Sequence, residues 1–108
     1  MHEINLKDWK KLIILEQLGN IGSEVGRSIK AYKNNDSRSF NAALFRALNL
    51  FEMTIKCNIK KRPDRVKEIL IARNEYLRLF FDNNFKDADN IERYFMYFAY
   101  AARYEKKY

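Results

Sequence analysis

The sequence predicts an all-α protein, an antiparallel up-down four-helix bundle. The chain has one proline and three glycines in 108 residues, so it holds little material for turns and favours a few long elements. Apolar residues recur at spacings of three and four in four stretches, the pattern of helices that bury one face. Short polar connections join these stretches, which places consecutive helices side by side.

Four amphipathic helices follow a polar N-terminal lead. Asp36 or Ser37 is the expected N-cap of the second helix, because both side chains can accept from a free backbone N–H. Pro63 should open the third helix, where its missing N–H costs nothing. The fourth helix should begin after Asp87 or Asp89, and Asp89 and Glu92 have the spacing of a capping box. The expected ranges are 1–12 for the lead and 13–33, 37–56, 63–81 and 89–105 for the helices.

The lead contains one large anchor, Trp9. Asn5 and Asp8 are expected to open a short helical turn there, because both side chains can accept from free N–H groups. The only histidine, His2, lies in the same segment, which we expect to be mobile. No internal repeat or linker divides the chain, so we expect residues 1–108 to form a single domain.

Composition limits the environment and the partners of the chain. The single Cys57 cannot form an intramolecular disulfide, and we expect a reducing, cytoplasmic setting. No apolar run approaches the roughly 18 residues that a membrane span requires, so we expect no membrane contact. The net charge of +7 permits nucleic acid or another acidic surface as a partner, although a biased composition would give the same charge.

The sequence excludes several chemistries. A di-iron site in a helical bundle uses Glu-x-x-His motifs, and no predicted helix contains a histidine. One cysteine and one histidine cannot form a zinc site or supply the usual nucleophilic arrangements, and no glycine-rich phosphate loop is present. We therefore expect no metal, no cofactor and no catalytic residue.

The three glycines fall on one flank of the first predicted helix, at Gly19, Gly22 and Gly26. Each interior glycine costs about 1 kcal/mol relative to alanine, so a close neighbour should offset that cost. We expect a helix–helix contact there, with Ala43 and Ala47 as its small partners. A ligand or phosphate against the bare backbone, or a kink in the helix, are the alternatives.

Charged residues at the edges of the apolar stripes predict a buried polar network. Arg73 falls at the centre of the stripe of the third helix, and a buried arginine needs a carboxylate, for which Glu24 or Glu52 is expected. The alternatives to a structural ion-pair network are an anion or nucleotide pocket and acid–base catalysis. The expected members are Glu24, Arg27, Arg46, Glu52 and Arg73.

A basic run surrounds the second predicted turn and is opposed in the sequence only by Asp64. It could neutralise several phosphates of a nucleic acid, or it could be a solvated charged turn. It has no interleaved aromatic residues on which bases could stack. Its members are Lys56, Lys60, Lys61, Arg62, Arg65 and Lys67.

A row of tyrosines lies on the fourth helix, opposite its apolar face. The row consists of Tyr97, Tyr100 and Tyr104, with Arg93 and Arg103 nearby. Exposed tyrosines at helical spacing favour an interface, because each covers a large area at a small entropic cost. We expect self-association through this row. Packing against the lead and its tryptophan, or stacking of nucleic-acid bases, are the alternatives.

Several segments resemble a small family of bacterial and archaeal all-helical proteins without an assigned activity. The resemblance is carried by Leu18-Gly19-Asn20-Ile21-Gly22-Ser23-Glu24-Val25-Gly26-Arg27, by Arg46-Ala47-Leu48, by Tyr94-Phe95 and by Phe98-Ala99-Tyr100-Ala101-Ala102-Arg103. It covers nearly the whole chain and implies a complete, single-domain protein.

The architecture is also similar to that of HEPN domains, helical bundles that include toxin ribonucleases and helper subunits of minimal nucleotidyltransferases. Their ribonuclease signature is an arginine, a nearby polar residue and a histidine on one helix. Arg73-Asn74 matches the first part, but Arg78 stands where the histidine is needed. The resemblance therefore implies a silent helper more readily than a nuclease.

We expect a non-catalytic binding or adaptor module that forms a homodimer through the fourth helix or the glycine flank and that can take a further protein partner. The first alternative is an RNA- or nucleotide-binding helper of HEPN type, which would use the basic run and the region of Arg46 and Arg73. A ribonuclease is the second alternative, and it would depend on Arg73 alone.

Overall fold

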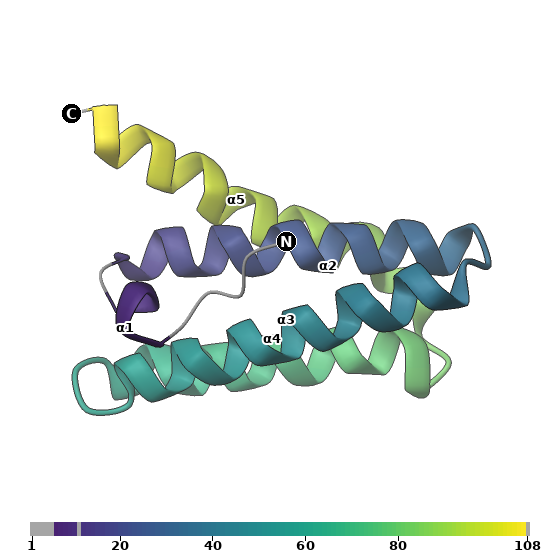
Figure 1. Cartoon of the computed structure of the whole chain (residues 1–108), viewed down its shortest axis with the longest axis horizontal. Coiled ribbons are helices and arrows are strands. Elements are labelled where there is room, and N and C mark those ends of the chain that lie inside the picture. The colour runs from purple at the N-terminus through teal and green to yellow at the C-terminus, as the bar shows by residue number, and fades with distance from the viewer. Residues whose placement is uncertain (1–5, 11, 108) are drawn as a thin grey trace.

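The fold is an all-α, up-down four-helix bundle, seen in a computed structural model that describes residues 6–10 and 12–107 (Figure 1). The side chains at positions 8 and 105–107 are not described, and the predictions for His2 and Asn5 fall outside the described residues. The helices are α1 (Leu6–Trp9), α2 (Ile14–Lys33), α3 (Ser37–Asn58), α4 (Pro63–Phe81), a 3₁₀ turn η1 (Phe85–Asp87) and α5 (Ala88–Lys107).

Consecutive long helices run in opposite directions (Figure 1). α2 contacts α3 and α5, and α4 contacts the same two helices from the other side, which gives the cyclic order of a bundle. α5 as a whole packs mainly on α2, and its C-terminal part diverges from α4 in Figure 1. None of the helices in the described part of the chain is long and apolar enough to cross a bilayer.

Local signals determine the first turn between long helices. The Asp36 carboxylate accepts a hydrogen bond from the backbone N–H of Ser39 at 3.1 Å, which confirms Asp36 as the N-cap of α3. Hydrogen bonds from the side chain and then the backbone of Ser39 lower the pKa of the Asp36 carboxyl group. Asn35 has a φ of 56°, and the N–H of Asp36 reaches back to the carbonyl of Ala31 at 2.9 Å. This is a Schellman turn with asparagine in the left-handed position.

The starts of α4 and α5 differ in how well the sequence predicts them. Pro63 is the first residue of α4, as expected. The capping box expected at Asp89 is wrong, because η1 leads directly into α5 at Ala88 and Asp89 lies within the first turn. Its carboxylate instead lies 3.7 Å from the Nζ atom of Lys33.

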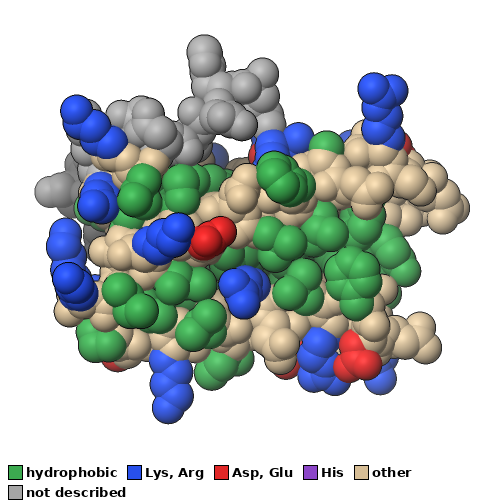
Figure 2. All heavy atoms as spheres, turned by 60° about the horizontal axis from the view of Figure 1, so that its bottom comes forward, with side chains coloured by type: hydrophobic (Ala, Val, Ile, Leu, Met, Phe, Trp, Pro, Cys, Tyr) green, Lys and Arg blue, Asp and Glu red, His purple; other side chains and the backbone are tan. Residues whose placement is uncertain are grey.

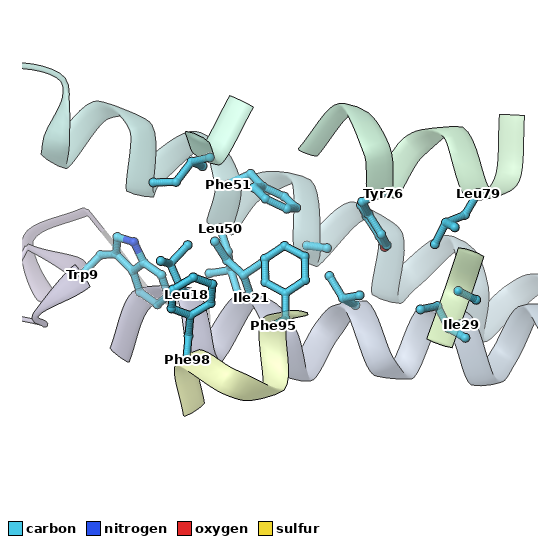
Figure 3. Packing of buried hydrophobic residues seen from close by; sticks show 14 residues of the cluster. Trp9, Leu18, Ile21, Ile29, Leu50, Phe51, Tyr76, Leu79, Phe95 and Phe98 are labelled. Carbon is cyan, nitrogen blue, oxygen red and sulfur yellow. The ribbon is translucent and has the colours of Figure 1, made fainter. Parts of the chain in front are cut away.

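The core is one cluster to which every α-helix contributes (Figure 3). The apolar spacing of residues 63–81 predicts a core stripe that includes Leu70 but not Leu79, whereas Leu79 is fully buried and Leu70 is 42% exposed. The spacing of residues 13–33 likewise predicts Tyr32 inside, but Tyr32 is 40% exposed. The members labelled in Figure 3 are Trp9, Leu18, Ile21, Ile29, Leu50, Phe51, Tyr76, Leu79, Phe95 and Phe98.

A buried chain of hydrogen bonds attaches the short α1 to α2 and α3. The indole Nε1 of Trp9 donates to Oγ1 of Thr54 at 2.9 Å, and Nε2 of Gln17 donates to the carbonyl of Trp9 at 2.9 Å. Nδ2 of Asn58 donates to Oε1 of Gln17 at 2.9 Å and to the carbonyl of Thr54 at 2.7 Å. These bonds anchor Trp9 in the core and extend α3 by two residues beyond the range expected from the sequence.

Candidate interaction surfaces

Glu24 is the centre of the polar network and joins α2 to α3. Its carboxylate is 7% exposed and accepts from Nη1 of Arg27 at 2.6 Å and from Nε of Arg46 at 2.8 Å. Both carboxylate oxygens therefore bind guanidinium groups, one from each helix. The bond from Arg46 crosses from α3 to α2, and charge-assisted bonds of this kind are stronger than those between neutral groups.

Arg73 and Glu52 do not belong to this network, contrary to expectation. Glu52 is exposed on α3 and pairs with Lys56 at 3.3 Å. Arg73 is half-buried, and no described residue forms an ion pair or hydrogen bond with it. Both oxygens of Glu24 already bind Arg27 and Arg46, which leaves neither for Arg73. Arg73 shares its side of α4 with Phe80, two turns later, whose ring packs on Phe40 of α3 at 4.7 Å and on Tyr32 of α2 at 5.1 Å.

Two of the three glycines are close-packing positions, but their neighbour is α5. A Cβ atom on Gly19 would lie 3.1 Å from Cα of Ala99, and one on Gly22 would lie 2.8 Å from Cβ of Phe95. The expected partners on α3 are therefore wrong. α3 meets α2 on the other side, where the buried carboxylate of Glu24 binds Arg46, so the glycine flank faces α5.

Gly26 has a different environment, because no atom lies within 4 Å of the place that its Cβ would occupy. It opens into a groove of about 320 Å³ between α2 and α5. The floor of the groove is the glycine flank, and the α5 wall carries Glu92, Met96, Tyr100 and Arg103.

Tyr100, one member of the expected tyrosine row, lines this groove. Tyr97 and Tyr104 are each 68% exposed and Tyr100 is 60% exposed. Trp9, the alternative cover for the row, is fully buried in the core instead. Tyr97 and Tyr100 therefore present most of their surface to solvent in the single chain.

The basic run is exposed but more neutralised than its sequence suggests. Arg62 lies 3.7 Å from Asp64, and Arg65 bonds Glu68 at 3.2 Å, one turn farther along α4. Glu52 takes Lys56. Within the described residues, the members without an ion pair are Lys60, Lys61 and Lys67.

An exposed apolar face lies over α3 and α4 and was not predicted from the sequence. Figure 2 shows hydrophobic side chains gathered on this side of the molecule with few acidic side chains among them. Helical periodicity indicates part of this face, because Phe45, Ile59 and Phe81 are large apolar residues outside the core stripes, whereas Leu70 is expected inside. The most exposed members are Phe45 at 66%, Ile59 at 55%, Leu70 at 42% and Phe81 at 68%.

A separate apolar hollow of about 560 Å³ lies between α4 and the start of α5. Ile71, Ala72 and Ile91 line it. The hydroxyl of Tyr94 donates across it to Oε1 of Glu68 at 3.0 Å. Burial, followed by the hydrogen bond to this carboxylate, raises the pKa of Tyr94 to about 12.

The side chains of Arg73 and Arg78 on α4 do not converge. Arg78 is exposed and bonds Asp82 at 3.0 Å and Glu75 at 3.3 Å, and these hydrogen bonds raise the pKa of its guanidinium. Arg73 lies on another side of α4, next to α3.

Comparisons with known proteins give no relative. No protein family matches the sequence, no curated protein matches it, and no solved structure matches the fold.

Proposed function

We propose that this chain is a non-catalytic binding module that pairs with a second copy of itself through the tyrosine row of α5. The observation that carries the proposal is the exposure of Tyr97 and Tyr100, at 68% and 60%, together with a groove with a bare-backbone floor that Tyr100 lines. Tyr100 and the groove lie on the same face of one chain. A face of this kind is self-complementary, which is what a two-fold interface requires.

The order of side chains along α5 supports an antiparallel pairing of two α5 helices centred near residue 98. In that register Glu92 of one copy meets Arg103 of the other, and Met96 meets Tyr100. Glu92 and Arg103 both line the groove, and within the described residues neither has an intrachain ion pair. In a two-fold dimer each of these contacts occurs twice, which doubles its contribution to the free energy of association.

A charge exchange tests this register. Glu92→Arg alone should shift the chain toward monomer in sedimentation velocity, because it places like charges together. Combining it with Arg103→Glu should restore the dimer. If Glu92→Arg leaves the association of the wild-type chain unchanged, or if the double variant stays monomeric while folded by circular dichroism, the register is wrong.

A second candidate is an RNA- or nucleotide-binding helper of HEPN type. The observation in its favour is that Lys60, Lys61 and Lys67 are exposed without an ion pair among the described residues. Fluorescence anisotropy of a labelled single-stranded RNA should then detect binding at physiological salt, weakened in Lys60→Glu/Lys61→Glu. Binding that vanishes between low and physiological salt would speak against this candidate.

A further inference from the structure

Arg73 lies on an apolar face, and no carboxylate among the described residues pairs with it. It precedes Phe80 by two helical turns, and Phe80 packs on Phe40 of α3 as well as on Tyr32 of α2. Ala72 lines the hollow on the α5 side of α4, so Arg73, Leu77 and Phe80 lie toward α3. Leu70 and Leu77, three residues before and four after Arg73, share its side of the helix. A permanent charge therefore lies in the middle of an apolar row.

α3 continues the same face. The ring of Phe51 meets Tyr76 of α4 at a centroid distance of 6.0 Å, which marks the side of α3 next to α4. Leu48 and Ile55, three before and four after Phe51, lie on that side and are half-buried. Phe45, one turn before Leu48, is 66% exposed at its edge.

A partner that covers this face must supply hydrogen bonds to the guanidinium of Arg73. In the free chain that group keeps part of its hydration, because Arg73 is only half-buried. Covering it with apolar surface alone would remove the remaining water without replacing its hydrogen bonds, which is costly. A carboxylate on the partner would replace them with bidentate, charge-assisted bonds.

We propose that the α3–α4 face, centred on Arg73, binds an amphipathic helix of an acidic partner protein that contributes an apolar ridge and one carboxylate to Arg73. The net charge of +7 on the chain favours an acidic partner over a second copy. A two-fold pairing centred on this face would bring two Arg73 guanidinium groups together. The inference rests on the proposed binding role but not on the pairing through α5, which uses another side of the bundle.

The test is a selection from a library of displayed 20-residue peptides that form amphipathic helices, with apolar residues at spacings of three and four. One position inside the apolar stripe of each peptide is fully randomised. Selections are run against the wild-type chain, Arg73→Gln and Arg73→Glu. Arg78→Gln is the matched control, because Arg78 lies on the same helix but is exposed and already paired with Glu75 and Asp82. Enriched helices are then labelled, and their affinities are measured by fluorescence anisotropy.

The wild-type chain should enrich Asp or Glu at the randomised position, and those helices should bind Arg73→Gln about tenfold more weakly or worse. Arg73→Glu should select Lys or Arg instead, while Arg78→Gln should bind like the wild type. The absence of enriched helices, enrichment without an acidic preference, or equal binding to Arg73→Gln would overturn the proposal. Arg73 has no ion pair within the described chain, so Arg73→Gln should melt like the wild type.

Two further measurements separate this proposal from the others. The double variant Tyr97→Ser/Tyr100→Ser should bind the selected helices as the wild type does, even if its own association is lost. If Arg73→Glu alone changes the sedimentation of the chain, the occupant of the face is a second copy, and the acidic-helix proposal is overturned.

Discussion

The backbone of Gly22 lies directly against Phe95, so close that a Cβ on the glycine would come within 2.8 Å of the Cβ of Phe95. This contact is where α2 and α5 meet. It explains why a helix that otherwise has good helix formers carries a residue that costs about 1 kcal/mol relative to alanine. The close approach depends on the missing side chain.

Gly22→Ala should therefore lower the free energy of unfolding by about 1–3 kcal/mol, and Gly22→Leu by more, because the added atoms force α2 and α5 apart. Gly26→Ala is the matched control. The space beside Gly26 is open, so this change should be neutral or stabilising by up to about 1 kcal/mol. Urea unfolding of dilute protein measures both. Equal stability of the two variants would contradict the packing at Gly22.

Removing the side chain of Gln17 should destabilise the chain more than removing an exposed amide. Gln17 is buried and both donates to the carbonyl of Trp9 and accepts from Asn58. Gln17→Ala should cost about 1–3 kcal/mol, because it leaves buried polar groups unpaired. Asn20→Ala, an exposed position on the same helix, should cost less than about 0.5 kcal/mol. Thermal unfolding followed by circular dichroism compares the two.

The two arginines on Glu24 should contribute unequally. Arg46 comes from another helix and is 34% exposed, whereas Arg27 lies one turn away on the same helix and is 59% exposed. Arg46→Gln should therefore cost more than Arg27→Gln, about 1–2 kcal/mol against less than about 1 kcal/mol. Denaturant unfolding provides the comparison. The reverse order would mean that the cross-helix bond does not hold α2 to α3.

Stability should fall at alkaline pH because of Tyr76. Burial raises the pKa of this tyrosine to about 12, above its value of 10 in the unfolded chain. The folded state therefore holds the phenolic proton more tightly, and this contribution is fully present below pH 10 and lost as the pH rises toward 12. Its size is on the order of 2 kcal/mol.

Tyr76→Phe should flatten this alkaline slope even though it loses the 2.7 Å hydrogen bond between Tyr76 and Ser28. Unfolding free energies at several pH values between 9 and 11 would measure the slope. Tyr94, which has a raised pKa as well but is 37% exposed, should contribute less. An unchanged slope in Tyr76→Phe would place the alkaline sensitivity elsewhere in the chain.

Helix ends were predictable where one residue determines them. Asp36 caps α3 and Pro63 begins α4, because side-chain capping and proline geometry act over a few neighbouring residues. Asp89 was misleading, since the spacing of a capping box carries no information about whether a 3₁₀ turn precedes the helix.

Tertiary relationships were less predictable. Periodicity placed the glycines on one flank of α2 but could not say which helix lies against that flank, and the neighbour is α5 rather than α3. It also placed Arg73 in an apolar stripe, yet α4 is rotated so that Leu79 faces the core and Arg73 faces the seam with α3. The bond between Gln17 and Asn58 joins residues 41 positions apart and has no local signal.

Sedimentation velocity of the wild-type chain over a wide concentration range tests the proposed pairing most directly. We expect the wild-type chain to form a species of twice the chain mass that dissociates on dilution. Tyr97→Ser/Tyr100→Ser should be a monomer at every concentration, with an unchanged circular dichroism spectrum. A wild-type chain that stays monomeric throughout, or a double variant that still dimerises like the wild type, would contradict the proposed pairing.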